Sequence, residues 1–227
     1  MVKIVKKKRW FNIVAPELFK GQLIGQTYLG DVPEAVGRSV SVNMSTLIGD
    51  SSRQNSKATF IITGANGENL QTSFVKFQIV PSALKKMVKR NRSKIDDSYT
   101  IKLTDAVAKF KIIIITKSNA RGKIEALLFK VARAWVAMQA SRITFEQLLI
   151  DSVQKKFTKA LQRYLSRIYP VTVCEVRYLE KLAGEAAEIA VPIKPDNEVL
   201  KMMEQRENEA KAEAIAKAPQ SEQPVQA

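Results

Sequence analysis

Few side chains in this sequence could do chemistry, because it contains no histidine and a single cysteine. The chain therefore lacks the commonest general base and metal ligand, and it cannot form a Ser-His-Asp or Cys-His arrangement. Carboxylates remain: Asp96 and Asp97 are adjacent, and Asp50 lies in a polar stretch. Such acids could bind a divalent ion. The sequence has no signature of a pocket, however, and in that case acids far more often lie in turns or on the surface.

The remaining nucleophile is Cys174, which lies in an apolar, alternating stretch typical of a strand. That position favours a buried, inert thiol, and one cysteine excludes an intrachain disulfide and a cysteine zinc cluster. Lys86 and Lys89 are candidate reactive amines, but they fall on an open cationic face. The sequence also lacks a Walker loop and a Gly-x-Gly-x-x-Gly motif that opens a helix. We therefore expect no enzyme, no cofactor and no metal site.

Positive charge is the strongest signal in the sequence. The 37 lysines and arginines outnumber the 22 acids, which gives a net charge of +15. The excess is uneven: residues 185–227 hold nine acids and five bases, so residues 1–184 carry about +19. This exceeds what solubility requires and indicates that the body of the protein binds a polyanion.

The first cationic cluster opens the chain. Its members are Lys3, Lys6, Lys7, Lys8 and Arg9. Because like charges repel until phosphates neutralise them, we expect residues 1–20 to form a basic arm that folds onto an anionic surface. Trp10 and Phe11 follow at once and could stack on a base, although aromatic residues beside Ile13 are more often core anchors. We predict that the five cations and Trp10 bind RNA.

The second cationic cluster lies within residues 81–94. If residues 82–91 form a helix, Leu84, Met87 and Val88 share one arc that can dock on a core, and cations lie opposite. The cations of this segment, which we call the cationic strip, are Lys85, Lys86, Lys89, Arg90, Arg92 and Lys94. A charge run of this kind is often only a solvated surface helix. We predict RNA binding because the rest of the chain is basic as well.

Alternation of apolar and polar residues predicts strands through the first half of the chain. The candidate strands are residues 22–29, 40–44, 58–63, 70–79, 99–103 and 109–116. The Asn66-Gly67 pair is a strong hairpin signal between two of them, which implies antiparallel pairing. A change of phase between Phe74 and Phe77 indicates a bulge or strong bend, which would begin to curl the sheet towards a barrel.

The later chain is mainly helical. Residues 124–140 have apolar side chains at helical spacing, and Thr144 with Gln147 forms a capping box for a second amphipathic helix that Pro170 ends. A last strand over 171–178 would return to the sheet. We therefore predict an α+β fold, with an antiparallel β-barrel-like core, an inserted basic helix, two further amphipathic helices and a returning C-terminal strand.

This pattern divides the chain into four expected segments. They are a basic N-terminal arm (1–20), the barrel-like core with the inserted helix 82–91 (21–118), a helical region with the final strand (119–183) and a mildly acidic tail (184–227). The low apolar content of the tail predicts disorder and a marginal helix over 200–217. The N-terminal apolar stretch is too short for a signal peptide, and no apolar run is long enough to span a membrane.

Further cations are expected on the exposed sides of the two later helices and between strands. Phosphate neutralisation uses many such groups over a large surface and needs no small cleft. A folded structural RNA therefore fits the distribution better than a short base-specific site. The sequence has no helix-turn-helix, zinc-finger or leucine-zipper signature.

A series of short motifs runs in order along most of the chain. They are Lys7-Lys8-Arg9-Trp10-Phe11, Ala15-Pro16-Glu17-Leu18-Phe19, Ile24-Gly25-Gln26-Thr27, Gly37-Arg38-Ser39-Val40, the glycine hairpin, residues 72–77, the basic residues 84–94, Ile143-Thr144-Phe145 and Ile168-Tyr169-Pro170. Together they resemble the small-subunit ribosomal protein family S3Ae, called eS1 in unified naming. The resemblance extends to about residue 182, and the compact length is similar to that of archaeal members.

The resemblance implies a structural protein without catalytic activity, located in the cytoplasm as part of the small (30S) ribosomal subunit. It would brace ribosomal RNA on the platform near the messenger RNA exit, beside neighbouring platform proteins, and take part in translation. Messenger RNA and initiation factors would be further partners, whereas a membrane or a second copy of the chain would not. A family arginine aligns with Arg133, which the resemblance adds to the RNA-binding residues.

Two other interpretations stay open at this point. A free RNA-binding chaperone or translation factor would share the positive charge and would associate with RNA reversibly. An enzyme acting on nucleic acid would need a metal-dependent carboxylate site, which the acids of this sequence do not assemble.

Overall fold

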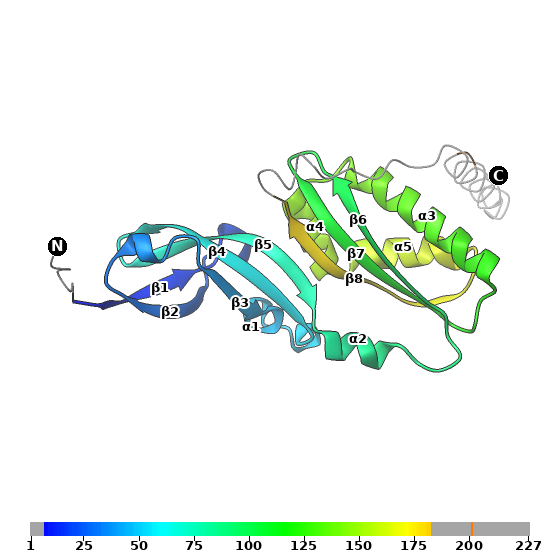
Figure 1. Cartoon of the computed structure of the whole chain (residues 1–227), viewed down its shortest axis with the longest axis horizontal. Helices are drawn as coiled ribbons and strands as arrows, with labels where there is room; N and C mark the ends of the chain where they lie inside the picture. Colours follow the sequence, from blue (N-terminus) through cyan, green and yellow to red (C-terminus); the bar gives the residue numbers. More distant parts are fainter. Residues whose placement is uncertain (1–6, 183–200, 202–227) are drawn as a thin grey trace, which may run out of the picture.

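The computed structural model describes residues 7–182 and the single residue 201. Within this range the protein is elongated and has two parts, as Figure 1 shows. The first part holds β1 (Arg9–Val14), β2 (Leu23–Leu29), β3 (Ser39–Asn43), α1 (Met44–Ile48), β4 (Ser56–Asn66) and β5 (Asn69–Ile79). The second part holds β6 (Lys94–Lys102), β7 (Val107–Thr116), α3 (Gly122–Ala140), α4 (Phe145–Val153), α5 (Lys156–Ser166) and β8 (Val171–Lys181). The helix α2 (Pro81–Met87) lies between the two parts (Figure 1).

The hairpin of β4 and β5 confirms the antiparallel pairing predicted from its turn. Asn66 pairs with Asn69 next to the turn, and Gly67 has a φ of +65°, a conformation that favours glycine. Thr59 pairs with Lys76, whereas Phe60 pairs with Phe74. Val75 is therefore an extra residue on β5, and it accounts for the phase change predicted between Phe74 and Phe77.

Strand β5 connects the two parts, because different segments of it pair with different strands. Its start pairs parallel with β1, and its end, Lys76–Gln78, pairs antiparallel with Tyr178–Glu180 of β8. The result is one eight-stranded sheet, in which β3 and β4 branch from the order β2-β1-β5-β8-β7-β6. The combination of helices and one sheet is confirmed. The sheet is not wholly antiparallel as predicted, because β1 and β5 pair parallel. The pairings form no closed ring, so the barrel-like part of the prediction is not confirmed.

In the second part the three helices pack against the antiparallel strands β6, β7 and β8. The side chain of Phe110 on β7 lies between Tyr99 of β6 and Phe157 of α5, with ring centroids 5.6 and 5.9 Å away. Trp135 of α3 reaches the same Phe157 ring at 5.1 Å. Aromatic contacts therefore fix α3 and α5 to the sheet.

A second row of aromatic rings joins the two parts of the molecule. Phe19, Phe60 and Phe74 follow each other in the first part, with centroids 5.6 and 5.7 Å apart. Phe74 then contacts Phe145, the first residue of α4, at 5.8 Å. Because Phe60 and Phe145 are both buried, this row is continuous core and not a surface contact.

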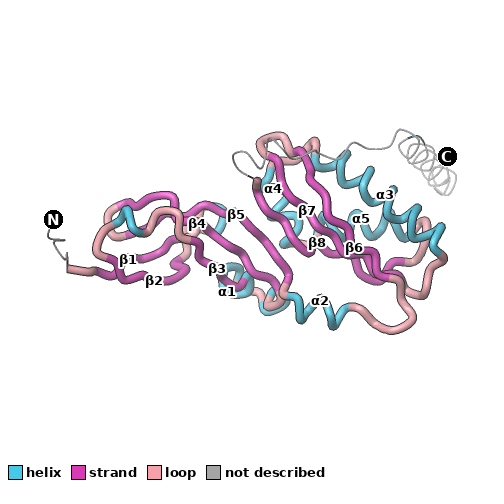
Figure 2. The backbone as a smooth tube through the Cα atoms, in the orientation of Figure 1, coloured by secondary structure: helices cyan, strands magenta, loops and turns pink. Residues whose placement is uncertain are grey.

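The inserted basic helix is shorter than predicted. Helix α2 ends at Met87 instead of residue 91, and a loop leads from it to β6 (Figure 2). Val88 is extended and Asn91 is left-handed, with a φ of 59°. The loop is fixed at buried Ser93, whose backbone N–H donates a 3.0 Å hydrogen bond to Thr116 Oγ1. The chain must therefore leave the helix early to reach the last residue of β7.

The helix predicted after Thr144 is divided in two. The capping box of Thr144 and Gln147 is present, but α4 ends at Val153 and α5 begins at Lys156. Lys155 is left-handed, with a φ of 60°, and its Nζ lies 2.5 Å from Glu175 Oε1. The helical spacing of apolar residues continues on both sides of residues 154–155, which contain neither glycine nor proline. No local signal therefore predicts this break.

The structure describes most of the expected N-terminal arm but almost none of the expected tail. Residues 9–14 of the expected arm form β1, because they pair with β2 over six residues. Residues 1–6 lie outside the described residues, as does nearly all of the predicted tail. Of the expected helix at 200–217, only residue 201 belongs to the described part.

Candidate nucleic-acid interface

The described part of the N-terminal cluster lies at the start of β1. Lys7, Lys8, Arg9 and Trp10 are all exposed, and Trp10 is 63% accessible. Lys3 and Lys6 lie outside the described residues. Strand β1 is at the end of the molecule far from α3, α4 and α5 (Figure 1), so these cations can reach a partner that does not touch the helices.

The aromatic pair at this end was only half predicted. Trp10 pairs with Tyr28 across the β1–β2 ladder, and their ring centroids are 5.2 Å apart. Tyr28 is 52% accessible. Sequence reasoning missed Tyr28. Its position beside Trp10 depends on the register of β1 and β2, and the segment that joins these strands has no hairpin signal from which that register could be predicted.

The cationic strip occupies α2 and the loop after it. Lys85 and Lys86 lie in the last turn of α2, where the helix dipole favours positive charge. Lys89 and Arg90 lie in the loop and are exposed like the two lysines. The four cations are thus exposed and lie within six residues of each other. They belong to α2 and the loop after it, a segment that lies between the two parts (Figure 2).

The last two members of the strip are more constrained. Arg92 is half-buried. Lys94 Nζ lies 3.0 Å from Asp96 Oδ2, and Arg177 contacts the same carboxylate oxygen. Asp96 therefore offsets part of the positive charge at this end of the strip.

Arg133 is the most constrained of the predicted RNA-binding residues. Its Nε and Nη2 donate hydrogen bonds of 2.7 and 2.8 Å to Oδ2 and Oδ1 of Asp97. The guanidinium carbon also lies 4.1 Å from the centre of the Phe129 ring. Arginine can form two parallel hydrogen bonds to a carboxylate and stack on a ring at the same time, and lysine cannot. Its binding to RNA stays a prediction, and its structural role is to join α3 to β6.

The carboxylates considered at first as a metal site lie apart. Asp96 and Asp97 are successive residues of β6, so their side chains point to opposite faces of the strand and pair with different arginines. Asp50 accepts hydrogen bonds from the Ser52 hydroxyl and the Ser52 backbone N–H, which lower the pKa of that carboxyl. Within residues 7–182, no group of three or more potential metal ligands is present.

The thiol and two tyrosines are held in their neutral forms. Burial raises the pKa of Cys174 and of Tyr99. Burial also raises the pKa of Tyr178 to about 12, assisted by the 2.6 Å hydrogen bond that its hydroxyl donates to Glu180. A thiol with a raised pKa is a poor nucleophile at neutral pH.

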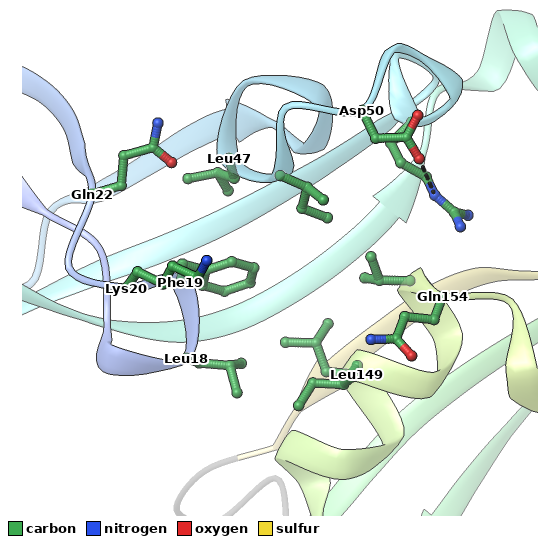
Figure 3. A pocket seen from close by; sticks show the side chains of 12 residues that line it. Leu18, Phe19, Lys20, Gln22, Leu47, Asp50, Leu149 and Gln154 are labelled. Carbon is green, nitrogen blue, oxygen red and sulfur yellow. Dashed lines mark ion pairs between the residues drawn. The ribbon is translucent and has the colours of Figure 1, made fainter.

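A groove of about 660 Å³ lies between the two parts (Figure 3). Leu18, Phe19 and Leu47 line it from the first part, and Leu149 of α4 lies opposite (Figure 3). The ion pair of Asp50 and Arg53, at 3.6 Å, belongs to its border. The lining is mainly apolar, and the arrangement offers no pair of groups for acid–base chemistry.

A comparison with known families gives these surfaces a context. Residues 2–183 match the model of the ribosomal S3Ae family. The chain belongs to this family. The match includes the N-terminal cluster, the cationic strip and every described strand and helix from β1 to β8.

Relatives of this S3Ae chain carry one common description. This chain is 29% identical over 186 residues to the small ribosomal subunit protein eS1 of Halorubrum lacusprofundi. The alignment covers 82% of this chain and 86% of the relative. It is also 29% identical to the eS1 protein of Archaeoglobus fulgidus (79% and 86% covered) and 28% identical to that of Nanoarchaeum equitans (77% and 90% covered). The resemblance seen in the sequence is thereby confirmed.

In this S3Ae protein the candidate interface is a set of separate exposed surfaces and not a single cleft. The N-terminal cluster and the strip lie on different elements, and Arg133 lies on α3.

None of the described helices is long and apolar enough to cross a membrane.

Proposed function

We propose that this chain is a structural constituent of the small ribosomal subunit, in the cytoplasm, which takes part in translation by binding and bracing ribosomal RNA. It performs no catalysis. The match of residues 2–183 to the ribosomal S3Ae family carries this proposal. The relatives are themselves described as small ribosomal subunit proteins.

The exposed cations support the RNA-binding part of the proposal. Ribosomal RNA presents a phosphate at every nucleotide, and lysines and arginines that neutralise phosphates bind without regard to sequence. In this proposal the N-terminal cluster and the strip bind separate stretches of RNA backbone, because they lie on different elements of an elongated molecule.

The location within the subunit is part of the same proposal. The protein would lie on the platform near the messenger RNA exit, beside neighbouring platform proteins, with messenger RNA and initiation factors within reach. The arm (1–20), the core with its inserted helix (21–118) and Arg133 of the helical region (119–183) would bind RNA, and the mildly acidic tail (184–227) would follow them.

Sedimentation of a native cell extract at rising salt tests the proposal. The proposal expects the protein, quantified by mass spectrometry, to remain equimolar with other small-subunit proteins in the small-subunit peak. Recovery mainly at the top of the gradient at low salt would contradict it and would favour a free RNA-binding chaperone or translation factor.

A further inference from the structure

The outer face of β1 and β2 carries a row of side chains that the electrostatic account leaves unexplained. Trp10 and Tyr28 are partners across the ladder and so project from the same face, as do the next partners along that face, Asn12 and Gln26. The opposite face carries Phe11, Ile13 and Leu29, which belong to a buried cluster. The first face is therefore the solvent side of this ribbon.

The amide side chains on this face are linked to one another. Gln26 Nε2 donates a 2.9 Å hydrogen bond to Asn12 Oδ1, and Asn12 Nδ2 donates one of 3.3 Å to Asn69 Oδ1 on β5. These two bonds fix the orientation of the Asn12 side-chain amide. Each primary amide has two donors and one acceptor, so exposed Gln26 and Asn69 keep hydrogen-bonding groups for a ligand.

We propose that this face is a stacking site for an unpaired RNA base, in which the Trp10–Tyr28 pair contacts the ring and the amide row contacts its edge. Single-stranded RNA is recognised in this way on exposed sheets, by aromatic rings that stack on bases and polar groups that read their edges. The inference rests on the proposed function, since it assumes that the protein binds RNA.

The spacing along the strand fits such a ligand. Residues two apart on one strand face lie about 7 Å from each other, so Asn12 and Gln26 lie one such step from the rings. That step matches the distance from the centre of a stacked base to groups just beyond its edge. Both rings are more than half exposed, so a base can reach them without rearrangement of the core.

Charge next to the rings favours a nucleic acid over a protein as the occupant. Lys7, Lys8 and Arg9 directly precede Trp10 and are exposed. Within the described part of the chain, none of these three forms an ion pair with an acid. Arg9 is the partner of Leu29 and projects from the opposite face, where its guanidinium carbon lies 5.9 Å from the centre of the Phe11 ring. A nucleotide on the ring face brings a phosphate to Lys7 or Lys8 and a base to the rings, and so uses both features at once.

Binding of a fluorescently labelled oligoadenosine RNA to the full-length chain, followed by anisotropy, tests the inference. Trp10→Leu and Tyr28→Leu should each weaken binding roughly 5- to 140-fold, the range that alanine substitution of stacking residues gives. Trp10→Phe keeps a ring and should restore most of the affinity. The same RNA as a duplex should bind all variants alike, because its bases are already stacked.

Leu23→Ala is the matched control, since Leu23 is a non-aromatic β2 residue that is 54% accessible. It should bind the oligomer like the wild type, and circular dichroism should show that all variants fold. Equal oligomer affinity in wild type and both leucine variants would overturn the stacking site and leave the proposed function intact. An equal loss for Leu23→Ala would also overturn it, because exposed apolar side chains in general, and not the ring pair, would then carry the affinity for the oligomer. A wild-type chain that binds neither RNA would contradict the proposed function as well.

Discussion

The Arg133 guanidinium on α3 holds the Asp97 carboxylate on β6 with two parallel hydrogen bonds of 2.7 and 2.8 Å. The Asp97 side chain is only 8% exposed, whereas that of Arg133 is 37% exposed. The pair is therefore half inside the fold. Charged groups of this kind stabilise a protein mainly because removal of one partner leaves the other without compensation.

Replacement of Arg133 by alanine should accordingly destabilise the protein by about 2 to 3 kcal/mol, because Asp97 would lose a charge-assisted fork in a nearly buried position. Urea unfolding measures the change. Asp97→Asn in the same background should recover part of the loss, because it removes the uncompensated charge. An unchanged unfolding free energy together with weaker RNA binding would mean that Arg133 serves RNA and not the fold.

Phe145→Ala should loosen the junction between the two parts. The substitution removes the ring that meets Phe74 at 5.8 Å, and truncation of a buried phenylalanine costs about 3 to 5 kcal/mol. We expect separate unfolding transitions for the two parts. The fluorescence of buried Trp135 follows the second part, and far-ultraviolet circular dichroism follows the whole chain. Phe157→Ala is the control, because Phe157 contacts only second-part rings. A single coincident transition in Phe145→Ala would refute the role of this junction.

Stability should fall at alkaline pH because of Cys174. Burial raises the pKa of this thiol in the folded state, so above the ordinary thiol pKa of about 8.5 the folded protein binds one more proton than the unfolded chain. The unfolding free energy must then decrease with rising pH, by about 1.4 kcal/mol per pH unit from this group. Below that pKa the contribution is complete.

Cys174→Ala should remove most of this slope between about pH 8.5 and 9.5, measured by denaturant unfolding under reducing conditions. Tyr99, whose pKa burial also raises, should continue to lower stability in the variant once the pH exceeds about 10. A slope that is identical in variant and wild type would show that the thiol is not buried as described.

The sequence was sufficient where short-range patterns decide structure. Alternation located β2 to β8, whereas β1 lies in the segment expected to be an arm. The phase change at Phe74 and Phe77 corresponds to the extra residue Val75. Thr144 capped a helix as its spacing to Gln147 required. Patterns of this kind depend on neighbours within a few residues, which a single sequence displays.

The features that sequence reasoning missed depend on distant partners. Arg133 is 36 residues from Asp97, and Lys155 leaves the helical conformation where its side chain meets Glu175 on β8. Helix α2 stops where Ser93 is bound to Thr116. Tertiary contacts overrode local helix propensity at the last two positions.

The central claim is that exposed cations hold this chain on ribosomal RNA in the small subunit. The decisive variant changes Lys85, Lys86, Lys89 and Arg90 to glutamine. Its charge-matched control changes four exposed cations outside the predicted sites. These are Lys57, Lys102, Lys109 and Arg142.

The measurement is the fraction of each protein that sediments with small subunits at a series of salt concentrations. Each lost phosphate contact lowers the salt slope of binding by about 0.7 to 0.9, so the strip variant should have a slope smaller by about 3 and should leave the subunit at lower salt. The control should behave like the wild type. Identical salt profiles for the wild type and the strip variant would contradict the claim that the strip binds ribosomal RNA.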